Sequence, residues 1–349
     1  MNTIIEKTDK DNIDKEVILK AADILRNGGL VAFPTETVYG LGGNALDAKA
    51  SEKIYAAKGR PSDNPLIVHI SRVEDLYELS PDVSPKALKL AKAFWPGPLT
   101  MILPKLPCVP DSITGGLPSV AIRMPSHPIA LELIRESGIY VAAPSANLSG
   151  RPSPTTAEHV ANDLAGRIDM IIDGGPANVG LESTIVDLTE DTPTILRPGF
   201  ITLEDIKKVL GSAEMDKALM SGIKENAVPK APGMKYRHYA PKGDLTIVLG
   251  DDENVSRKIN ELVAQKEGSG YKVAVMAKAE NVCRYSCKVI KNLGDSDAEY
   301  AAHTLYSYLR EFDDMGIEYI YSEGFDEDKL GQALMNRLMK AAAQQVIKV

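Results

Sequence analysis

The sequence LVAFPTETVYGLGG, residues 30–43, joins a short apolar run to a glycine-rich loop. Four consecutive apolar residues are typical of a strand buried on both faces, and Pro34 ends it because proline cannot donate to a strand ladder. Before it, apolar residues recur at helical spacing and predict a helix over residues 14–27 that stops at Gly28-Gly29. This order of helix, buried strand and glycine-rich loop indicates an α/β domain.

Further short apolar runs continue this pattern along the first 210 residues. They lie at residues 66–70, 99–103, 120–124, 140–143, 170–172 and 184–188, and each predicts a buried strand. Helical patterns separate many of them, whereas several neighbours are joined by turns too short for a crossover helix. We therefore predict an α/β fold with an N-terminal twisted mixed sheet and flanking helices.

The chain is long enough for two domains. Its 349 residues exceed the usual limit of a single hydrophobic core. Beyond residue 212 the pattern weakens, and residues 229–241, PKAPGMKYRHYAP, look extended. From residue 245 strand and helix patterns alternate, which predicts a smaller Rossmann-like α/β domain. We expect domains at residues 1–210 and 243–349, with a linker at 211–242 that is either a plain tether or a lid that contacts the ligand.

Composition narrows the function classes. The formal net charge is -8, and both parts of the chain are acidic when it is divided at residue 210. Strong direct nucleic-acid binding is therefore not expected, since it normally requires a positive surplus. No apolar run long enough to span a membrane is present, and the first residues lack a signal-peptide pattern, so we expect a cytoplasmic protein. Neither the three cysteines nor the five histidines form a metal-ligand pattern, so no protein metal ligand is assigned.

Two separate tripeptides, Lys58-Gly59-Arg60 and Ser145-Ala146-Asn147, suggest an anion-handling site. The two cations follow a helical run, and proline-rich sequence stiffens the turn after them. Arginine grips phosphate with a planar fork, while lysine acts as a point charge, so a nucleotide triphosphate is an obvious ligand. The alternative is a helix end whose cations merely complement the helix dipole. The chain has no Walker phosphate loop and no Gly-x-Ser-x-Gly nucleophile elbow.

Taken in order, several motifs resemble the YrdC-like family over roughly residues 10 to 210. They are PTETVYGLG at 34–42, KGRP at 58–61, PLIVHI at 65–70, WPGPLT at 95–100, AIRMP at 121–125 and PSAN at 144–147. The linker motif PGMKYRHYAP at 232–241 and the trailing α/β domain are similar to the longer, two-domain members, the threonylcarbamoyl-AMP synthases.

The resemblance implies a reaction and its participants. Members make threonylcarbamoyl-AMP from L-threonine, bicarbonate and ATP and release pyrophosphate, with Mg2+ expected alongside ATP. Downstream tRNA threonylcarbamoyltransferase proteins then place the group on an adenosine of tRNA. The alternative from another class is a double-stranded RNA or tRNA-binding protein without catalysis, since relatives of this domain have been regarded as RNA binders.

The resemblance also implies roles for individual residues. It assigns catalysis and ATP binding to Lys58 and Arg60, and ATP binding also to Asn64, Ser119, Asn147, Ser153, Arg197 and His238. It assigns threonine binding to Thr37, His69, Arg123, Ser145 and Ser183.

Residue chemistry alone leaves alternatives at several of these positions. Arg123 at a strand end could bind a carboxylate with two bonds or form a surface salt bridge. His69 could be a core histidine, and Arg197 a surface cation. Thr37 and Ser183 could merely cap turns.

Overall fold

The computed structural model describes residues 2–349 except 218, 220–238, 296–297 and 327–328. These residues fall into two compact units. The first contains the chain up to Ser149 and continues from Ser153 towards the linker, and the second contains Gly150–Pro152 and the chain from residue 239 onward. The boundaries expected at residues 210 and 242 stay predictions, and most of the expected linker and lid, with His238, lies outside the described residues.

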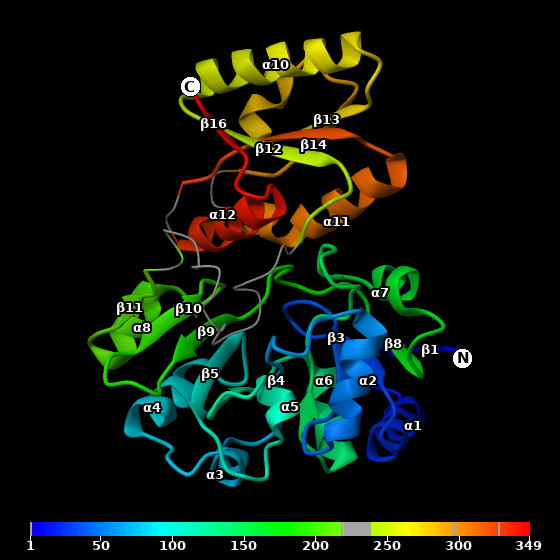
Figure 1. Cartoon of the computed structure of the whole chain (residues 1–349), viewed down its shortest axis with the longest axis vertical. Helices are drawn as coiled ribbons and strands as arrows, with labels where there is room; N and C mark the ends of the chain where they lie inside the picture. Colours follow the sequence, from blue (N-terminus) through cyan, green and yellow to red (C-terminus); the bar gives the residue numbers. More distant parts are fainter. Residues whose placement is uncertain (1, 218, 220–238, 296–297, 327–328) are drawn as a thin grey trace. The chain divides into compact units, whose positions relative to one another are not determined.

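The first unit alternates short strands with helices (Figure 1). Its strands are β1 (Ile4–Lys7), β2 (Val31–Phe33), β3 (Gly40–Asn44), β4 (Ile67–His69), β5 (Leu99–Pro104), β6 (Ser119–Arg123), β7 (Val141–Ala142), β8 (Met170–Asp173), β9 (Thr184–Asp187), β10 (Thr194–Arg197) and β11 (Glu214–Met215). Its helices are α1 (Lys15–Arg26), α2 (Ala48–Lys58), η1 (Val73–Asp75), α3 (Leu76–Leu79), α4 (Pro85–Phe94), α5 (Asp111–Thr114), α6 (Pro128–Ser137), α7 (Ala157–Leu164) and α8 (Leu203–Leu210).

The strands form one mixed sheet in the order β1-β8-β2-β3-β7-β4-β6-β5-β9-β10-β11. β2 runs antiparallel to β3, whereas β4 runs parallel to β6. The predicted mixed sheet is thereby confirmed. The predicted first helix is also confirmed, as α1. The Asp14 side chain caps its first turn by accepting a hydrogen bond from the Glu16 amide.

Helices cover both faces of this sheet. On one face α1 and α6 pack against Val31, Phe33 and Val141, which are fully buried. On the other, α2, α4 and α7 pack against the alternate strand residues, among them Ala32 and Leu41. Burial of each large apolar side chain contributes about 1.5 to 3 kcal/mol, so this two-sided packing stabilises the sheet that carries the site.

A row of polar residues crosses the centre of the sheet. In the strand pairings Arg123 lies opposite both His69 and Thr100, while Ile185 lies opposite both Thr100 and Arg197. Residues directly opposite one another project from the same face of a sheet. His69, Thr100, Arg123 and Arg197 therefore share one face although they come from four strands.

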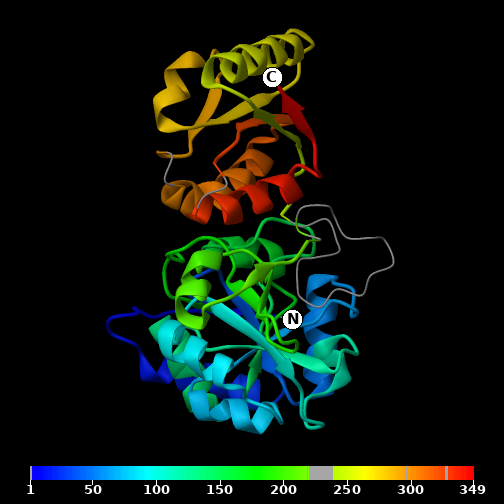
Figure 2. The same cartoon turned by 90° about the vertical axis from the view of Figure 1, so that its left-hand side faces the viewer.

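The second unit is a parallel α/β domain, as the sequence predicts. It contains β12 (Asp244–Leu249), α10 (Asp252–Gly268), β13 (Val273–Ala277), η2 (Ala279–Arg284), β14 (Val289–Asn292), α11 (Glu299–Met315), β15 (Tyr319–Glu323), α12 (Lys329–Ala341) and β16 (Val346–Lys348). The strand order is β14-β13-β15-β12-β16, and all described pairs are parallel. α10 covers one face of this sheet, and α11 and α12 cover the other (Figures 1 and 2). Among the described residues, no helix has the length and apolar character needed to cross a bilayer.

Candidate active site

Two loops far apart in the sequence are held together by backbone hydrogen bonds. The loop after β2 leads into β3, whose first residue, Gly40, forms an isolated bridge with Ser145 in the segment after β7. On either side of it, Leu41 N donates to Pro144 O over 2.8 Å and Ala146 N donates to Tyr39 O over 2.8 Å. The motifs at residues 34–42 and 144–147 therefore form one continuous wall.

Lys58, the last residue of α2, is directed into this wall. Its side chain is buried, and Nζ donates to the Asn147 carbonyl over 2.6 Å, to Asn147 Oδ1 at 3.4 Å and to the Ser145 carbonyl. Ser145 Oγ in turn donates to Asn147 Oδ1 over 2.6 Å. A cation that only complemented the helix dipole would remain in solvent. Lys58 instead anchors the Ser145–Asn147 segment and places a positive charge beneath it.

Arg60 organises the turn that follows. Gly59 ends α2 in the left-handed conformation at φ 60°, which glycine adopts without strain. The Arg60 guanidinium then donates to the carbonyls of Asn64 at 3.1 Å and Pro65 at 2.9 Å. The Asn64 side chain is buried, and its Oδ1 accepts no hydrogen bond from the residues that the structure describes. This turn therefore presents a buried amide oxygen with unused bonding capacity.

Arg123 is the centre of a second group of buried polar side chains. Arg123 is 4% exposed, its Nη2 donates to Thr37 Oγ1 over 2.9 Å, and the same nitrogen lies 2.7 Å from Glu36 Oε1. This burial contradicts the surface salt bridge considered from the sequence. Thr37 is likewise fully buried and bonded to Arg123, so it does more than cap a turn.

His69 lies beside Arg123 on the neighbouring strand. Its Nδ1 is 3.1 Å from the Ile67 carbonyl. Burial, followed by the positive charge of Arg123, lowers the pKa of His69 to about 3. His69 is therefore neutral at physiological pH, and the imidazole can serve as a hydrogen-bonding group next to a fixed cation.

Ser183 and Arg197 form a third group at the end of the polar row. Arg197 is 4% exposed, and it donates through Nη2 to Ser183 Oγ over 3.1 Å and through Nε to the Ser183 carbonyl over 3.0 Å. Ser183 Oγ also lies 2.8 Å from Thr100 Oγ1. Arg197 is thus no surface cation. The resemblance places Ser183 with threonine and Arg197 with ATP, and the structure brings the two side chains into contact.

The remaining expected residues are less closely joined. Ser153 Oγ donates to the buried Glu182 over 2.6 Å. Ser119 begins β6 opposite Pro104, at the other end of that strand from Arg123. Glu36, Thr100 and Glu182 are the residues that sequence reasoning missed. The one signal for Glu36 was a charged residue within an otherwise uncharged stretch at residues 30–43.

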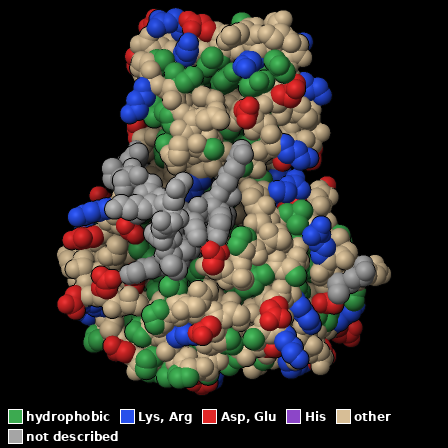
Figure 3. All heavy atoms as spheres, in the orientation of Figure 1, with side chains coloured by type: hydrophobic (Ala, Val, Ile, Leu, Met, Phe, Trp, Pro, Cys, Tyr) green, Lys and Arg blue, Asp and Glu red, His purple; other side chains and the backbone are tan. Residues whose placement is uncertain are grey.

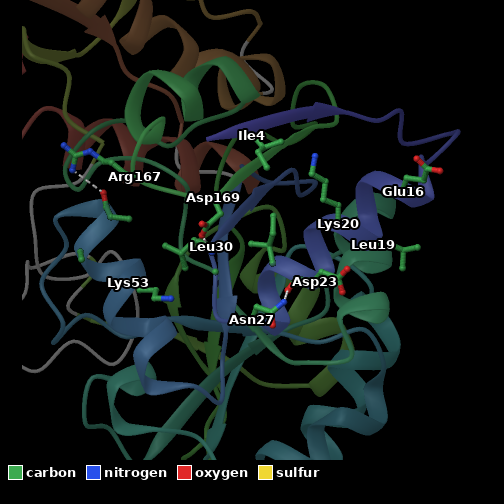
Figure 4. A pocket seen from close by; sticks show the side chains of 14 residues that line it. Ile4, Glu16, Leu19, Lys20, Asp23, Asn27, Leu30, Lys53, Arg167 and Asp169 are labelled. Carbon is green, nitrogen blue, oxygen red and sulfur yellow. Dashed lines mark hydrogen bonds between the residues drawn. The ribbon is translucent and has the colours of Figure 1, made fainter. Parts of the chain in front are cut away.

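A separate hollow lies between α1 and α2 (Figure 4). Its volume is about 1080 Å³, and its walls include Leu19, Asp23, Lys53 and Arg167. None of the twelve assigned residues that the structure describes lines it. The polar groups described above, rather than this hollow, therefore define the candidate site.

On the face drawn in Figure 3, charged side chains do not separate by sign, because Lys and Arg are interspersed with Asp and Glu. The formal net charge of the whole chain is -8. A protein that binds RNA mainly through phosphates would present a basic face, so neither observation favours the RNA-binding alternative.

Fold and site together define a two-domain α/β protein whose first domain directs the buried cations Lys58 and Arg123 onto two joined loops. Residues 23–199 match the Sua5, YciO and YrdC family, described as telomere recombination. Residues 201–343 match a family described as the C-terminal domain of threonylcarbamoyl-AMP synthase.

Relatives match nearly the whole chain. A threonylcarbamoyl-AMP synthase of Pyrococcus abyssi is 50% identical over 340 residues, which cover 97% of this chain and 98% of that relative. One of Bacillus subtilis is 49% identical over 349 residues, with coverages of 99% and 98%. The crystal structure of P. abyssi Sua5 complexed with L-threonine is 50% identical with a TM-score of 0.94, covering 99% of this chain and 100% of that one. The chain belongs to the family of two-domain threonylcarbamoyl-AMP synthases.

Proposed function

We propose that this protein makes L-threonylcarbamoyl-AMP from L-threonine, bicarbonate and ATP, with release of pyrophosphate. The observation that carries the proposal is the convergence of two cation groups on adjoining loops. One, around Lys58, suits a triphosphate, and the other, around Arg123, suits the carboxylate of an amino acid. In the family to which the chain belongs, the product supplies the threonylcarbamoyladenosine modification of tRNA.

Positioning and charge stabilisation account for most of the proposed catalysis. The carbamate formed on the threonine amine attacks the α-phosphorus of ATP, and pyrophosphate leaves. Lys58 and Arg60 stabilise the charge on the phosphates during this step, and Asn147 binds beside them. Asn64, Ser119, Ser153, Arg197 and His238 complete the proposed ATP contacts.

The proposed threonine contacts come from the second group of side chains. Arg123 binds the substrate carboxylate, and Thr37, His69, Ser145 and Ser183 contact the rest of the molecule. Pairing with the threonine hydroxyl lets such a pocket reject valine strongly. Serine lacks only one methyl group, worth about 1 to 3 kcal/mol, so serine is the expected competitor.

Magnesium is the proposed companion of ATP. Among the described residues, no group of three or more His, Cys, Asp or Glu side chains is arranged to hold a metal ion. Mg2+ commonly binds through substrate phosphates and water with one or two carboxylates, and no residue of this chain is assigned to it. When bound, the ion would neutralise phosphate charge.

The proposed setting is the cytoplasm, where ATP and tRNA are both present. We propose that downstream tRNA threonylcarbamoyltransferase proteins take up the product. Residues 1–210 would then act as the catalytic domain, with 211–242 as linker and lid and 243–349 as the second domain.

A direct assay tests the proposal. Purified protein is incubated with ATP, radiolabelled bicarbonate and L-threonine, and both pyrophosphate and labelled threonylcarbamoyl adenylate are measured. Threonine-dependent formation of both products in equal amounts is the expected result. Pyrophosphate no higher than in a threonine-free control would contradict the proposed function, and salt-sensitive tRNA binding in its place would favour the RNA-binding alternative.

A further inference from the structure

Glu36 is a buried carboxylate within the candidate site. It lies on the loop between β2 and β3 and is 6% exposed. The loop backbone is fixed on both sides of its side chain, since Val179 N donates to Glu36 O over 2.8 Å and Gly180 N donates to Thr37 O over 3.0 Å. Backbone hydrogen bonds, rather than bonds made by the carboxylate, therefore hold Glu36 in place.

The side chain of Glu36 has bonding capacity that its neighbours leave unused. Oε1 lies 2.7 Å from Arg123 Nη2, but neither carboxylate oxygen receives an aligned hydrogen bond from any described residue. Arg123 Nε and His127 Nδ1 are also buried without a hydrogen-bond partner in the described chain. A buried carboxylate accepts up to about four hydrogen bonds, so an arrangement with spare acceptors and a spare donor is suited to a polar ligand.

The pair formed by Arg123 and Glu36 matches the charge pattern of a free amino acid. A zwitterion carries its carboxylate and its ammonium on one carbon atom, and Arg123 and Glu36 present the opposite charges side by side. Arg123 Nε can then donate to the carboxylate, and Glu36 Oε2 can accept from the ammonium.

We propose that Glu36 binds the ammonium group of the amino-acid substrate and accepts one proton from it. This inference rests on the proposed function. The proton balance is complete with the substrates already named. The ammonium gives one proton to the Glu36 carboxylate, and the lone pair left on nitrogen forms a bond to the carbon of bicarbonate. Hydroxide leaves that carbon with the second nitrogen proton as water, which yields the carbamate. Glu36 returns its proton to solvent after the products depart.

A purely structural role would be that of a counter-ion for Arg123. In that role Glu36 neutralises a buried guanidinium in the unliganded protein and makes no contact with the substrate amine. The two roles differ in one respect that can be measured. Only in the proposed role does loss of the Glu36 charge weaken binding of a ligand that carries the ammonium more than binding of a ligand that lacks it.

Calorimetric titration of the full chain separates the two roles. The wild type, Glu36→Gln and Glu36→Asp are titrated with L-threonine and with 3-hydroxybutanoate, which lacks the amine. Glu158→Gln is the matched control, because Glu158 is exposed on α7. Thermal unfolding of each variant verifies its folding, and Glu36→Asp retains the charge if Glu36→Gln does not fold.

The proposal predicts a selective loss. Glu36→Gln should weaken L-threonine binding about 10- to 100-fold, the loss expected for a charge-assisted hydrogen bond, with little change for the analogue. The affinity of Glu36→Asp for L-threonine should lie between those of the wild type and Glu36→Gln, and that of Glu158→Gln should match the wild type. Equal weakening for both ligands, or none for either, would overturn ammonium binding.

Steady-state kinetics test the proton transfer. At saturating threonine, Glu36→Gln should lower kcat for pyrophosphate release more than Glu36→Asp does, with the KM for ATP unchanged. An unchanged kcat would refute the proton transfer. A wild type that binds threonine but releases no pyrophosphate would contradict the proposed function and leave the calorimetric test valid.

Discussion

Two buried glutamates, one in each unit, show what distinguishes the site from an ordinary core. Glu36 in the first unit is 6% exposed and Glu323 in the second is 2% exposed. Both carboxylate oxygens of Glu323 accept hydrogen bonds, Oε2 from the Lys278 amide over 2.7 Å and Oε1 from the Tyr285 hydroxyl. Glu36 receives no aligned hydrogen bond from any described residue. Burial alone is therefore uninformative, whereas burial with spare bonding capacity indicates a place for a ligand.

The largest expected effect in this comparison concerns Lys58. Lys58→Ala removes both the cation and the bonds that anchor the Ser145–Asn147 segment. Loss of such a preorganised group typically costs 100-fold or more, and we expect a fall of about 1,000-fold in pyrophosphate release. Lys53→Ala on the same helix is the control. Lys53 is exposed, and its Nζ donates to the Gly28 carbonyl, away from the proposed site. Activity within tenfold of the wild type for Lys58→Ala would remove Lys58 from the proposed site.

The two units should respond oppositely to acid. Because the folded-state pKa of His69 is lowered from 6.5 to about 3, the unfolded chain binds more protons between these values, and stability falls as pH falls. Between pH 6.5 and pH 5 this loss is about 2 kcal/mol at most. Burial raises the pKa of Glu323 above its ordinary 4.5, so its contribution to stability increases as pH falls towards that value.

Hydrogen exchange of the full chain at pH 7 and pH 5, corrected for intrinsic rates, measures both responses. Peptides of β4 and β6 should lose protection at pH 5, while those of β13 and β15 should retain it. His69→Gln should flatten the response of the first unit. Equal loss of protection in both units would contradict the assignment of these two groups.

A smaller effect is expected at Thr100. Thr100→Val keeps the shape of the side chain but removes the 2.8 Å contact with Ser183 Oγ. Loss of one neutral hydrogen bond costs about 1 kcal/mol, so the KM for threonine should rise about five- to tenfold with kcat nearly unchanged. Steady-state kinetics with varied threonine measure this. A change in kcat alone would show that the polar row does not serve substrate binding.

The smallest effect on activity is expected in the second unit. Tyr285→Phe removes the hydroxyl that donates to Glu323 and should lower the free energy of unfolding by about 1 kcal/mol. Pyrophosphate release should remain within about twofold of the wild type, because this carboxylate stabilises the fold. Denaturant unfolding and the activity assay together check the prediction. A large loss of activity at unchanged stability would give the second unit a direct role in the reaction.

Much of the fold could be predicted from the sequence because it depends on local patterns. Apolar spacing located α1 and most of the buried strands, and the short connections indicated a mixed sheet. It missed β10 and also β3, whose residues lie mostly in the stretch interpreted as a glycine-rich loop. The polar row could not be predicted from the sequence, because it depends on strand order. β4 lies between β6 and β7, so His69 and Arg123 become neighbours only in the folded sheet.

The same distinction applies to the candidate site. Cation chemistry singled out Lys58 and Arg60, yet it could not distinguish a solvated helix end from a buried anchor. Glu36 was missed because a single carboxylate in a loop carries no pattern. Glu36 becomes a candidate site residue only through its contact with Arg123, which is 87 positions further along the chain.

A crystal structure of the full chain with L-threonine and a non-hydrolysable ATP analogue tests the central claim most directly. We predict the threonine carboxylate on Arg123, its ammonium on Glu36, and the triphosphate over Lys58 and Arg60. The residues around Glu323 should remain without ligand. Threonine bound away from Arg123, or a triphosphate that contacts neither Lys58 nor Arg60, would contradict this account.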